Sequence, residues 1–275
     1  MILTISNLKN ESNLQIIDNK NKKGQTMKVI FLHHSSFLVE LERTILIFDY
    51  FAGGRVNGFH FTGTIPKLDT GKKIYVFASH KHQDHFDMDN LKLAKQYPGI
   101  RFVFSKDCKM SRKFLTKHGF PASITEKITY TAPDKEYELD DIKIRTLMST
   151  DAGCAFCVHA EGISIYHAGD LNWWYWEGVG DLINGKMERG FKRQMRQIEN
   201  EHFRFAFVPL DPRQGKDAFK GFGYFMQHID ADHVFPMHMW QDYSMIQEYK
   251  SRTDNDYFLN RIVDITRENE CFLYD

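Results

Sequence analysis

Three histidines and two aspartates occupy ten consecutive positions of this chain, in the stretch ASHKHQDHFD from Ala78 to Asp87. Neutral imidazole rings placed side by side do not attract one another, so this density of titratable groups indicates a shared positive partner. Imidazole nitrogens together with carboxylate oxygens are suitable ligands for Zn(II), Mn(II) or Fe(II). The stretch therefore predicts a site for divalent metal ions.

The spacing within the stretch suits two neighbouring ions. His80, His82, Asp84 and His85 form the pattern H-x-H-x-D-H directly after the apolar run IYVF. In an extended segment, side chains two positions apart project to the same side, so His80 and His82 can hold one ion. Asp84 and His85 follow where the backbone turns, and we expect them to face a neighbouring site. The absence of a nearby thiolate in the sequence disfavours a closed structural zinc site.

Two further candidates lie far downstream, each at the end of a predicted strand. The segment ISIYHAGD ends with His167 and Asp170, and the segment HVFPMH ends with His238. A carboxylate that follows a strand is well placed to bridge two ions, which is the arrangement that two-metal hydrolysis uses. Asp170 is therefore the candidate bridge, and His167 is expected to be structural or to support a ligand.

Together these residues resemble the metallo-β-lactamase superfamily of metal-dependent hydrolases. The resemblance rests on the pattern at 80–85, on Asp170, on the late His238, and on opening strands in which Asp49 takes the superfamily's usual structural aspartate position. It spans roughly residues 28–245 and is closest to the branch of ascorbate-6-phosphate lactonase-like and other poorly characterised hydrolases. It implies an αββα sandwich and two divalent ions, with Zn(II) as the first expectation and Mn(II) or Fe(II) as alternatives.

The resemblance also implies the role of each ligand. The first ion would be bound by His80 and His82, the second by Asp84, His85 and His238, and both by Asp170. A hydroxide held between the ions would be the nucleophile, because bound divalent ions lower the pKa of water to about 7. Asp84 would in addition act catalytically, by orienting the hydroxide or moving its proton.

One ligand of the family pattern is missing. The superfamily usually supplies a further histidine to the first ion from a loop before the bridging aspartate, and here that loop reads LMSTDAGCAF. We expect Asp151 as the substitute, since a carboxylate oxygen can replace imidazole on such ions. Ser149 and Thr150 are weaker substitutes, and His159 lies in the middle of a predicted strand. Without Asp151 the first site would be weak, and the enzyme would work with a single ion or an oxygen-preferring metal such as Mn(II).

Two blocks of short strands must position these residues. Helix patterns separate and follow the blocks, which favours two packed sheets with helices outside, an α/β (α+β) four-layer αββα sandwich, over a doubly wound parallel sheet. The run at 72–79 is almost continuously apolar, as in a strand buried on both faces. The longest predicted helix covers 185–203. The predicted strands are 28–32, 36–41, 44–51, 72–79, 101–105, 127–132, 135–139, 142–149, 155–160, 163–169, 205–210 and 233–238, and the other predicted helices are 88–97, 109–120, 223–229 and 245–252.

The domain boundaries follow from composition. Residues 1–26 are polar and rich in Asn and Lys, and we expect a flexible N-terminal extension outside the active core. No Gly-, Pro- or Ser-rich linker divides the remainder, so 27–275 is predicted to be a single domain.

Composition limits the partners and the compartment. Lysine plus arginine equals aspartate plus glutamate, 36 each, so no overall field favours nucleic acid or an anionic membrane, and no apolar run is long enough to span a bilayer. Cys154 and Cys157 would lie on opposite faces of a strand, which is a poor geometry for a shared metal or disulfide. With no disulfide framework and no signal peptide, we expect a reducing cytoplasm.

Four other features have two interpretations each. His34, at the end of the first strand, would support a metal ligand or form a hydrogen bond within the core. The aromatic stretch LNWWYW at 171–176 would wall a substrate pocket or fill the core. Arg213, in PLDPRQG, would grip a phosphate or carboxylate, or would be solvated beside a turn built by Asp211. The basic stripe within 185–203 is interrupted by acidic residues, which favours a solvated face.

These observations predict a cytoplasmic metal-dependent hydrolase that cleaves an ester, lactone, amide or phosphodiester of a small molecule. One alternative is a nuclease on the same fold, which would need a basic groove. A second is a di-iron redox or oxygen-handling protein, since the same ligands hold iron. A third is a protein that only binds a ligand. The oligomeric state is left open.

Overall fold

The computed structural model describes residues 26–252 and 256–275 of the chain. The predicted N-terminal extension therefore lies outside the described residues, apart from Thr26. The strands are β1 (Met27–His33), β2 (Ser36–Glu40), β3 (Thr44–Phe48), β4 (Gly54–Val56), β5 (Phe59–Phe61), β6 (Lys73–Ala78), β7 (Arg101–Ser105), β8 (Ile128–Thr131), β9 (Glu136–Leu139), β10 (Ile142–Met148), β11 (Cys154–Ala160), β12 (Ile163–His167), β13 (His202–Pro209), β14 (Asp230–Met237) and β15 (Glu270–Tyr274). The helices are α1 (Leu93–Gln96), α2 (Arg112–Lys117), α3 (Asp181–Met195), α4 (Phe219–His228), α5 (Ser244–Lys250) and α6 (Asp256–Arg261).

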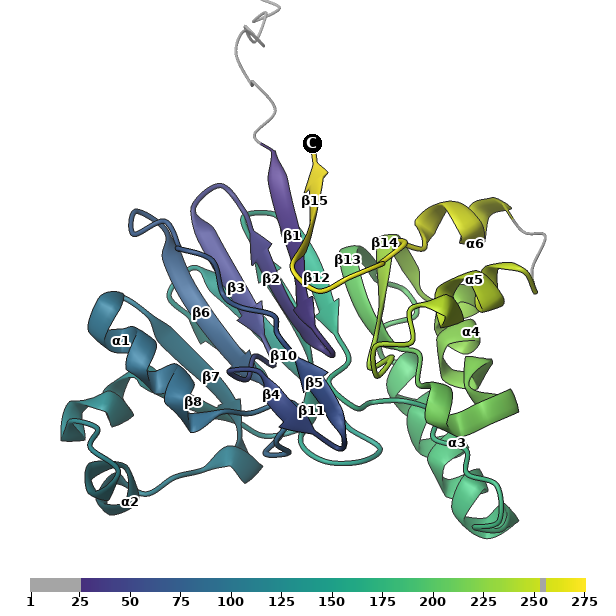
Figure 1. Ribbon diagram of the computed structural model, residues 1–275, viewed down its shortest axis with the longest axis horizontal. Coiled ribbons are helices and arrows are strands. Elements are labelled where there is room, and N and C mark those ends of the chain that lie inside the picture. The colour runs from purple at the N-terminus through teal and green to yellow at the C-terminus, as the bar shows by residue number, and fades with distance from the viewer. Residues whose placement is uncertain (1–25, 253–255) are drawn as a thin grey trace, which may run out of the picture.

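Two large sheets carry the fold, as Figure 1 shows. The first has the strand order β15-β1-β2-β3-β6-β7-β8 and the second has the order β14-β13-β12-β11-β10-β9, while β4 and β5 form a separate hairpin. In the first sheet, β3, β6, β7 and β8 run parallel to one another. In the second, β12, β13 and β14 are parallel. Parallel strands end at the same edge of a sheet, so the residues that follow them are gathered there.

The alternation of side chains along the strands produces the layers. In β6, Tyr75 and Phe77 belong to the core shared by the two sheets, whereas Ile74 and Val76 belong to a second core on the outer face of the first sheet. Phe77 contacts Phe156 of the opposite sheet, with ring centroids 5.2 Å apart. Successive strand residues point to opposite faces, so the strand is buried on both sides, as its continuous apolar run predicted.

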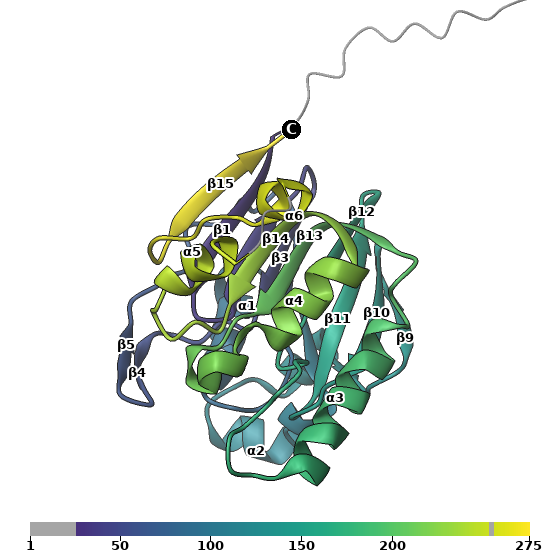
Figure 2. The ribbon, with the colours of Figure 1, turned by 90° about the vertical axis from the view of Figure 1, so that its right-hand side faces the viewer.

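Helices cover both outer faces. In Figure 1, α1 and α2 lie beside the first sheet, and in Figure 2, α3 and α4 lie along the second. Phe191 of α3 and Phe225 of α4 are buried in the core, and Phe225 stacks on Tyr166 of β12 with ring centroids 5.4 Å apart. The fold is therefore the predicted mixed α/β sandwich with two sheets between helical layers.

Several boundaries differ from the sequence prediction. The helix predicted over 185–203 begins earlier, at Asp181 after Gly180 with its positive φ of 86°, and ends at Met195. Residues 202 and 203 instead begin β13, because they pair with Asp230 and Ala231 of β14. The helix predicted over 88–97 is a 3-10 turn followed by the short α1. The hairpin β4–β5, the edge strand β15 and α6 were not predicted.

The four cysteines are free. Cys154 lies 3.7 Å from the Thr131 hydroxyl, and Cys157 lies beside the guanidinium of Arg145. Their different neighbours agree with the expectation that they occupy opposite faces of β11. Within the described ranges, the chain has no helix that is both long enough and apolar enough to cross a membrane.

Candidate metal centre

Two groups of four potential metal ligands form at the edge where the strands end. Within the described residues, the donor atoms of each group lie within 4.8 Å of one another. The first group is His80, His82, Asp151 and Asp170, and the second is His34, Asp84, His85 and His238. The structure therefore brings all seven sequence-predicted ligands together, in the two sets that the resemblance implied, and adds His34.

Asp170 lies between the two groups. Its Oδ2 is 3.5 Å from Nε2 of His80 in the first group. Its Oδ1 is 3.3 Å from Nε2 of His85 and 3.5 Å from Nε2 of His238 in the second. Each oxygen of the carboxylate faces a different group, which is the position that a bridging ligand requires.

Two glycines allow the loops that carry the aspartates to approach the histidines. A Cβ on Gly153 would lie 1.9 Å from the carbonyl oxygen of Ser79, and a Cβ on Gly169 would lie 2.5 Å from the Ser79 Cβ. Both glycines have positive φ, +65° and +55°, which side chains with a Cβ rarely adopt. Asp151 and Asp170 can therefore reach the histidine loop, residues 79–85, because the nearby Gly153 and Gly169 have no side chain.

Asp49 holds the histidine loop in place through hydrogen bonds. Fully buried, its carboxylate accepts hydrogen bonds from the Ser79 amide at 2.7 Å, from the Ser79 hydroxyl at 2.6 Å and from His85 Nδ1 at 2.8 Å. Burial opposes its charge, but His167, His85 and Ser79 outweigh burial and lower the pKa of Asp49. The structural role that the resemblance implied for Asp49 is thus visible as three hydrogen bonds.

Three of the buried histidines, His80, His85 and His238, are each held through Nδ1. Nδ1 of His80 meets the Ser79 hydroxyl at 2.9 Å, and Nδ1 of His238 meets Asp211 Oδ2 at 2.9 Å. As with His85, the outer nitrogen is anchored and Nε2 faces the carboxylate of Asp170. This arrangement is typical of metal-binding histidines, whose outer partner fixes the tautomer and the ring orientation.

Asp211 is a functional residue that the sequence interpretation placed only in a turn. Its buried carboxylate accepts from His238, and it also accepts two hydrogen bonds from Arg213 Nε, both at 3.0 Å. His238 and Arg213 together outweigh the effect of burial and hold the pKa of Asp211 well below its usual range. Its position after a strand was visible in the sequence, but its partner His238 is 27 residues away.

The donor chemistry fits divalent cations. Among the described residues, His85 Nε2 and Asp170 Oδ1 are buried without a hydrogen-bond partner, and so are both ring nitrogens of His34. Buried polar atoms are normally paired, so these orphans call for a partner of their own. Nitrogen and carboxylate donors that converge from two sides are satisfied by a cation of the kind that the sequence predicted.

The pKa shifts within the cluster also favour a bound cation. Burial disfavours charge on His85, but the carboxylates of Asp170, Asp84 and Asp49 outweigh it and raise the pKa of His85 to about 10. Burial likewise opposes the charge of Asp84, yet His85, His34 and His238 hold its pKa far below the usual range. The carboxylate of Asp84 is therefore ionised at neutral pH, and it attracts positive charge to the space that the donors share.

Asp151 lies beside His82 in the first group. Its Oδ2 is 3.7 Å from His82 Nδ1, and both side chains are half-exposed, at 48% and 49%. The alternatives are occupied elsewhere, since the Thr150 hydroxyl donates to the Asn172 carbonyl and the Ser149 hydroxyl accepts from the Asp151 amide. His159 pairs with Ser164 away from the cluster.

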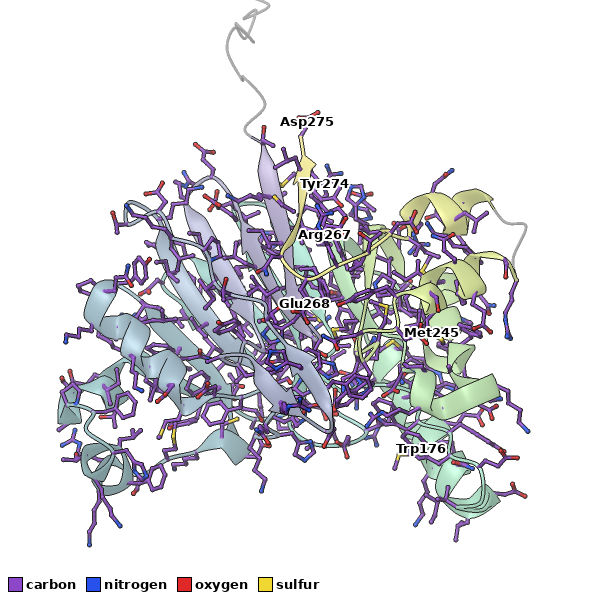
Figure 3. All side chains as sticks on the ribbon, viewed as in Figure 1. Trp176, Met245, Arg267, Glu268, Tyr274 and Asp275 are labelled. Atoms are coloured by element: carbon purple, nitrogen blue, oxygen red, sulfur yellow. The ribbon has the colours of Figure 1, made fainter. Side chains whose placement is uncertain are left out.

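A cavity of about 430 Å³ opens onto both groups. Trp174 and Trp176 form one wall, and their parallel rings have centroids 5.8 Å apart. Figure 3 shows Trp176 beside α3, at the opposite end of the molecule from Tyr274 of β15. Arg213 lines the same cavity, and its guanidinium carbon lies 4.5 Å from the Trp240 ring centroid. Part of the aromatic stretch therefore does wall a pocket, as one of its two interpretations proposed.

Part of the chain resembles a known family and a metal-dependent hydrolase. Residues 28–173 match the family model described as the beta-lactamase superfamily domain. A UPF0173 metal-dependent hydrolase of Opitutus terrae is 29% identical over 161 residues, which make up 52% of this chain and 63% of that protein. The match thus spans less than two thirds of this relative.

Two solved structures share the fold. Igni18, a metallo hydrolase from the archaeon Ignicoccus hospitalis, superposes with a TM-score of 0.58 and 17% identity over 91% of this chain and 99% of that one. A variant of the β-hydroxylase CmlA superposes with a TM-score of 0.50 and 11% identity over 78% and 46%. CmlA is a diiron enzyme of Streptomyces venezuelae. At such identities the likeness shows a shared fold and no shared activity.

Proposed function

Because the chain belongs to the beta-lactamase superfamily, whose domain it matches over residues 28–173, we propose that it is a metal-dependent hydrolase of small molecules. The observation that carries the proposal is the position of Asp170 between two groups of buried and half-buried donors. The name of its Opitutus terrae relative, a metal-dependent hydrolase, supports the same activity.

The residues present would hold two divalent ions, Zn(II) in the first instance. His80, His82 and Asp151 would bind one, His85, His238 and Asp84 the other, and Asp170 both. Bound divalent ions lower the pKa of a coordinated water to about 7 and so supply a nucleophile at neutral pH.

We assign to Asp84 the role of accepting a proton during the reaction. Its carboxylate lines the cavity, and its side chain is 13% exposed, so a water or substrate in the cavity can reach it. The neighbouring histidines keep it ionised, so it is a hydrogen-bond acceptor at neutral pH. Asp84 would orient the attacking water by accepting its hydrogen bond, and would receive a proton when the bond is cleaved.

The cavity supports a small, partly apolar substrate. Trp174, Trp176 and Val56 offer apolar surface, while Asn57 and Arg213 offer polar groups. The rest of the lining is mostly polar and includes the metal-facing side chains, so apolar contacts and placed polar groups would together orient a small molecule. An ester, lactone, amide or phosphodiester would fit this setting, and a negatively charged lactone, as in the ascorbate-6-phosphate lactonase-like branch, would pair with Arg213.

The nuclease alternative is less well supported. Three aspartates line the cavity, and Arg213 is the one lysine or arginine among its lining residues. A polyanion needs the opposite charge balance.

The free cysteines fit the proposed cytoplasmic location, because a reducing compartment keeps thiols unpaired.

The proposed function is tested by hydrolysis assays with and without metal. Purified protein is stripped with a chelator, reloaded with Zn(II), Mn(II) or Fe(II), and assayed on lactone, ester, amide and phosphodiester panels. We expect hydrolysis of at least one class that is lost on stripping and restored by a divalent ion. Turnover that requires oxygen and iron, with no hydrolysis by any metal form, would instead establish the di-iron alternative.

A further inference from the structure

We propose that His34 is a direct ligand of the second metal ion and closes that site, so that the two ions are bound with unequal strength. The proposal rests on the proposed function, because it takes the two donor groups to be metal sites. It goes further in assigning a ligand beyond the seven that the sequence predicted and in saying which ion is retained.

The side chain of His34 is placed as a ligand would be. It is fully buried, and its Nε2 lies 3.2 Å from Asp84 Oδ2. Its ring centroid is 4.2 Å from that of His238 and 5.7 Å from that of His85. The three imidazoles and the carboxylate thus surround one space, and their donor atoms all lie within 4.8 Å.

His34 has no other use for its nitrogens among the described residues. Neither ring nitrogen has a well-formed hydrogen bond, and the remaining neighbours include the rings of Phe61 at 5.4 Å and Trp240 at 4.5 Å. The adjacent His33 is also buried, but its Nε2 bonds the Phe51 carbonyl at 3.0 Å. The 3.2 Å contact of Nε2 with Asp84 is not a well-aligned hydrogen bond, so this buried imidazole is poorly paired. Such burial is costly, and a metal ion removes that cost.

The backbone is held in an unusual conformation at the same point. His34 has a positive φ of 49° and His238 one of 62°, and the His238 amide donates to the His34 carbonyl at 3.1 Å. Left-handed residues other than glycine persist where the surroundings over-determine them, and they concentrate at functional sites. This contact ties the end of β1 to the end of β14 and aims both imidazoles at one point.

The two groups differ in their access to solvent. In the second group, His34, His85 and His238 are buried and Asp84 is nearly so. With Asp170 Oδ1 these four side chains supply five donors, one more than a tetrahedral zinc ion takes, so the protein itself can fill the site. In the first group, His82 and Asp151 are half-exposed and leave open positions. The second ion is therefore the retained one, and the first is the one that solvent and substrate reach.

The test compares matched variants of the two adjacent histidines. His34→Asn removes the imidazole with a residue that tolerates positive φ, and His33→Asn removes a buried imidazole that faces no carboxylate of the cluster. Each folded protein, loaded with Zn(II), is dialysed against rising chelator concentrations, and zinc per chain is measured by mass spectrometry. Circular dichroism confirms the fold, and His34→Gly, which suits positive φ as well, is used for rescue with free imidazole.

We expect wild type to release one zinc early and one late. His34→Asn should release the late ion at a chelator concentration lower by more than about 100-fold, since even outer partners of ligands cost 10–100-fold in affinity. His33→Asn should match wild type, and imidazole should restore retention to His34→Gly.

Three results would overturn the inference. They are retention of zinc by His34→Asn equal to that of wild type, simultaneous release of both ions from wild type, and loss of retention in His34→Gly that imidazole does not restore. The last would leave His34 as a positioning residue for Asp84. A wild-type protein that binds no divalent ion at all would instead refute the proposed function.

Discussion

The carboxylate of Asp211 accepts a hydrogen bond from Nδ1 of His238 at 2.9 Å, and the same carboxylate holds the guanidinium of Arg213. Asp211 therefore links a metal-facing imidazole to the wall of the cavity. Because this bond leaves Nε2 of His238 free to face Asp84 and Asp170, the aspartate positions the ligand without touching the metal space.

Replacing Asp211 with Asn should weaken the metal site. The neutral amide holds His238 less firmly and stabilises its bound form less, so zinc affinity should fall about 10–100-fold. Competition with a chromophoric chelator measures the affinity. The control is Asp217→Asn, because Asp217 ends the 3-10 turn Pro212–Asp217 that Asp211 caps but is paired with Lys220. This variant should bind zinc as wild type does. Equal affinity in the two variants would contradict the role of Asp211.

Adding a methyl group at Gly153 should damage the site and the fold together. The new Cβ would overlap the Ser79 carbonyl, so Gly153→Ala should cost about 2 kcal/mol more than Gly162→Ala, within the range of overpacking. Gly162 is the matched control because its φ is also positive, at +83°, while nothing lies within 4 Å of its Cβ position. Urea unfolding measures both variants. Equal losses would show that the close approach to Ser79 is unimportant.

Removing the guanidinium of Arg213 should affect negatively charged substrates. Arg213→Gln should raise KM about tenfold for an anionic lactone or ester and leave KM for its neutral analogue nearly unchanged, since a charge-assisted hydrogen bond contributes about 1.5–3 kcal/mol. Lys216→Gln, in the same 3-10 turn Pro212–Asp217 and paired with the exposed Glu177, is the control. A uniform change in kcat for both substrates would point to an effect through Asp211 instead.

Stability should depend on pH through Glu40. Burial opposes its charge, but Lys28 and Lys72 outweigh burial and hold the pKa of its carboxyl below the ordinary 4.5. A lowered pKa stabilises the folded state above the unfolded value, and this contribution is lost as the pH falls through the folded pKa. Wild type should therefore exceed Glu40→Gln by up to about 1 kcal/mol near neutral pH. Urea unfolding at falling pH should show the difference shrink below the unfolded pKa and vanish below the folded pKa, and a constant difference would contradict this role of Glu40.

Much of the metal centre was predictable because it is local in sequence. His80, His82, Asp84 and His85 lie within six positions after a buried strand, so their spacing and the geometry of an extended chain suffice to pair them. Asp151 was predictable as the only carboxylate in the loop where the family supplies a histidine.

The remaining parts depend on contacts between distant segments. His34 reaches the centre because its left-handed backbone turns the end of β1 toward His238, some 200 residues away, and a single sequence carries no sign of that contact. Asp211 joins His238 for the same reason. Short elements such as β4 and β5 have too few residues for a periodic pattern, although Val56 and Asn57 at their turn line the cavity.

The central claim is that two divalent ions share Asp170, and the metal content of wild type and Asp170→Asn tests it most directly. Both proteins are loaded with Zn(II), freed of loose metal by gel filtration, and analysed for zinc per chain together with their hydrolysis of the best substrate. The account predicts two zinc ions in wild type, at most one in Asp170→Asn, and hydrolysis lowered by at least about 1000-fold, as expected when a group that assembles the reactive centre is lost. Two zinc ions and undiminished hydrolysis in Asp170→Asn would contradict it.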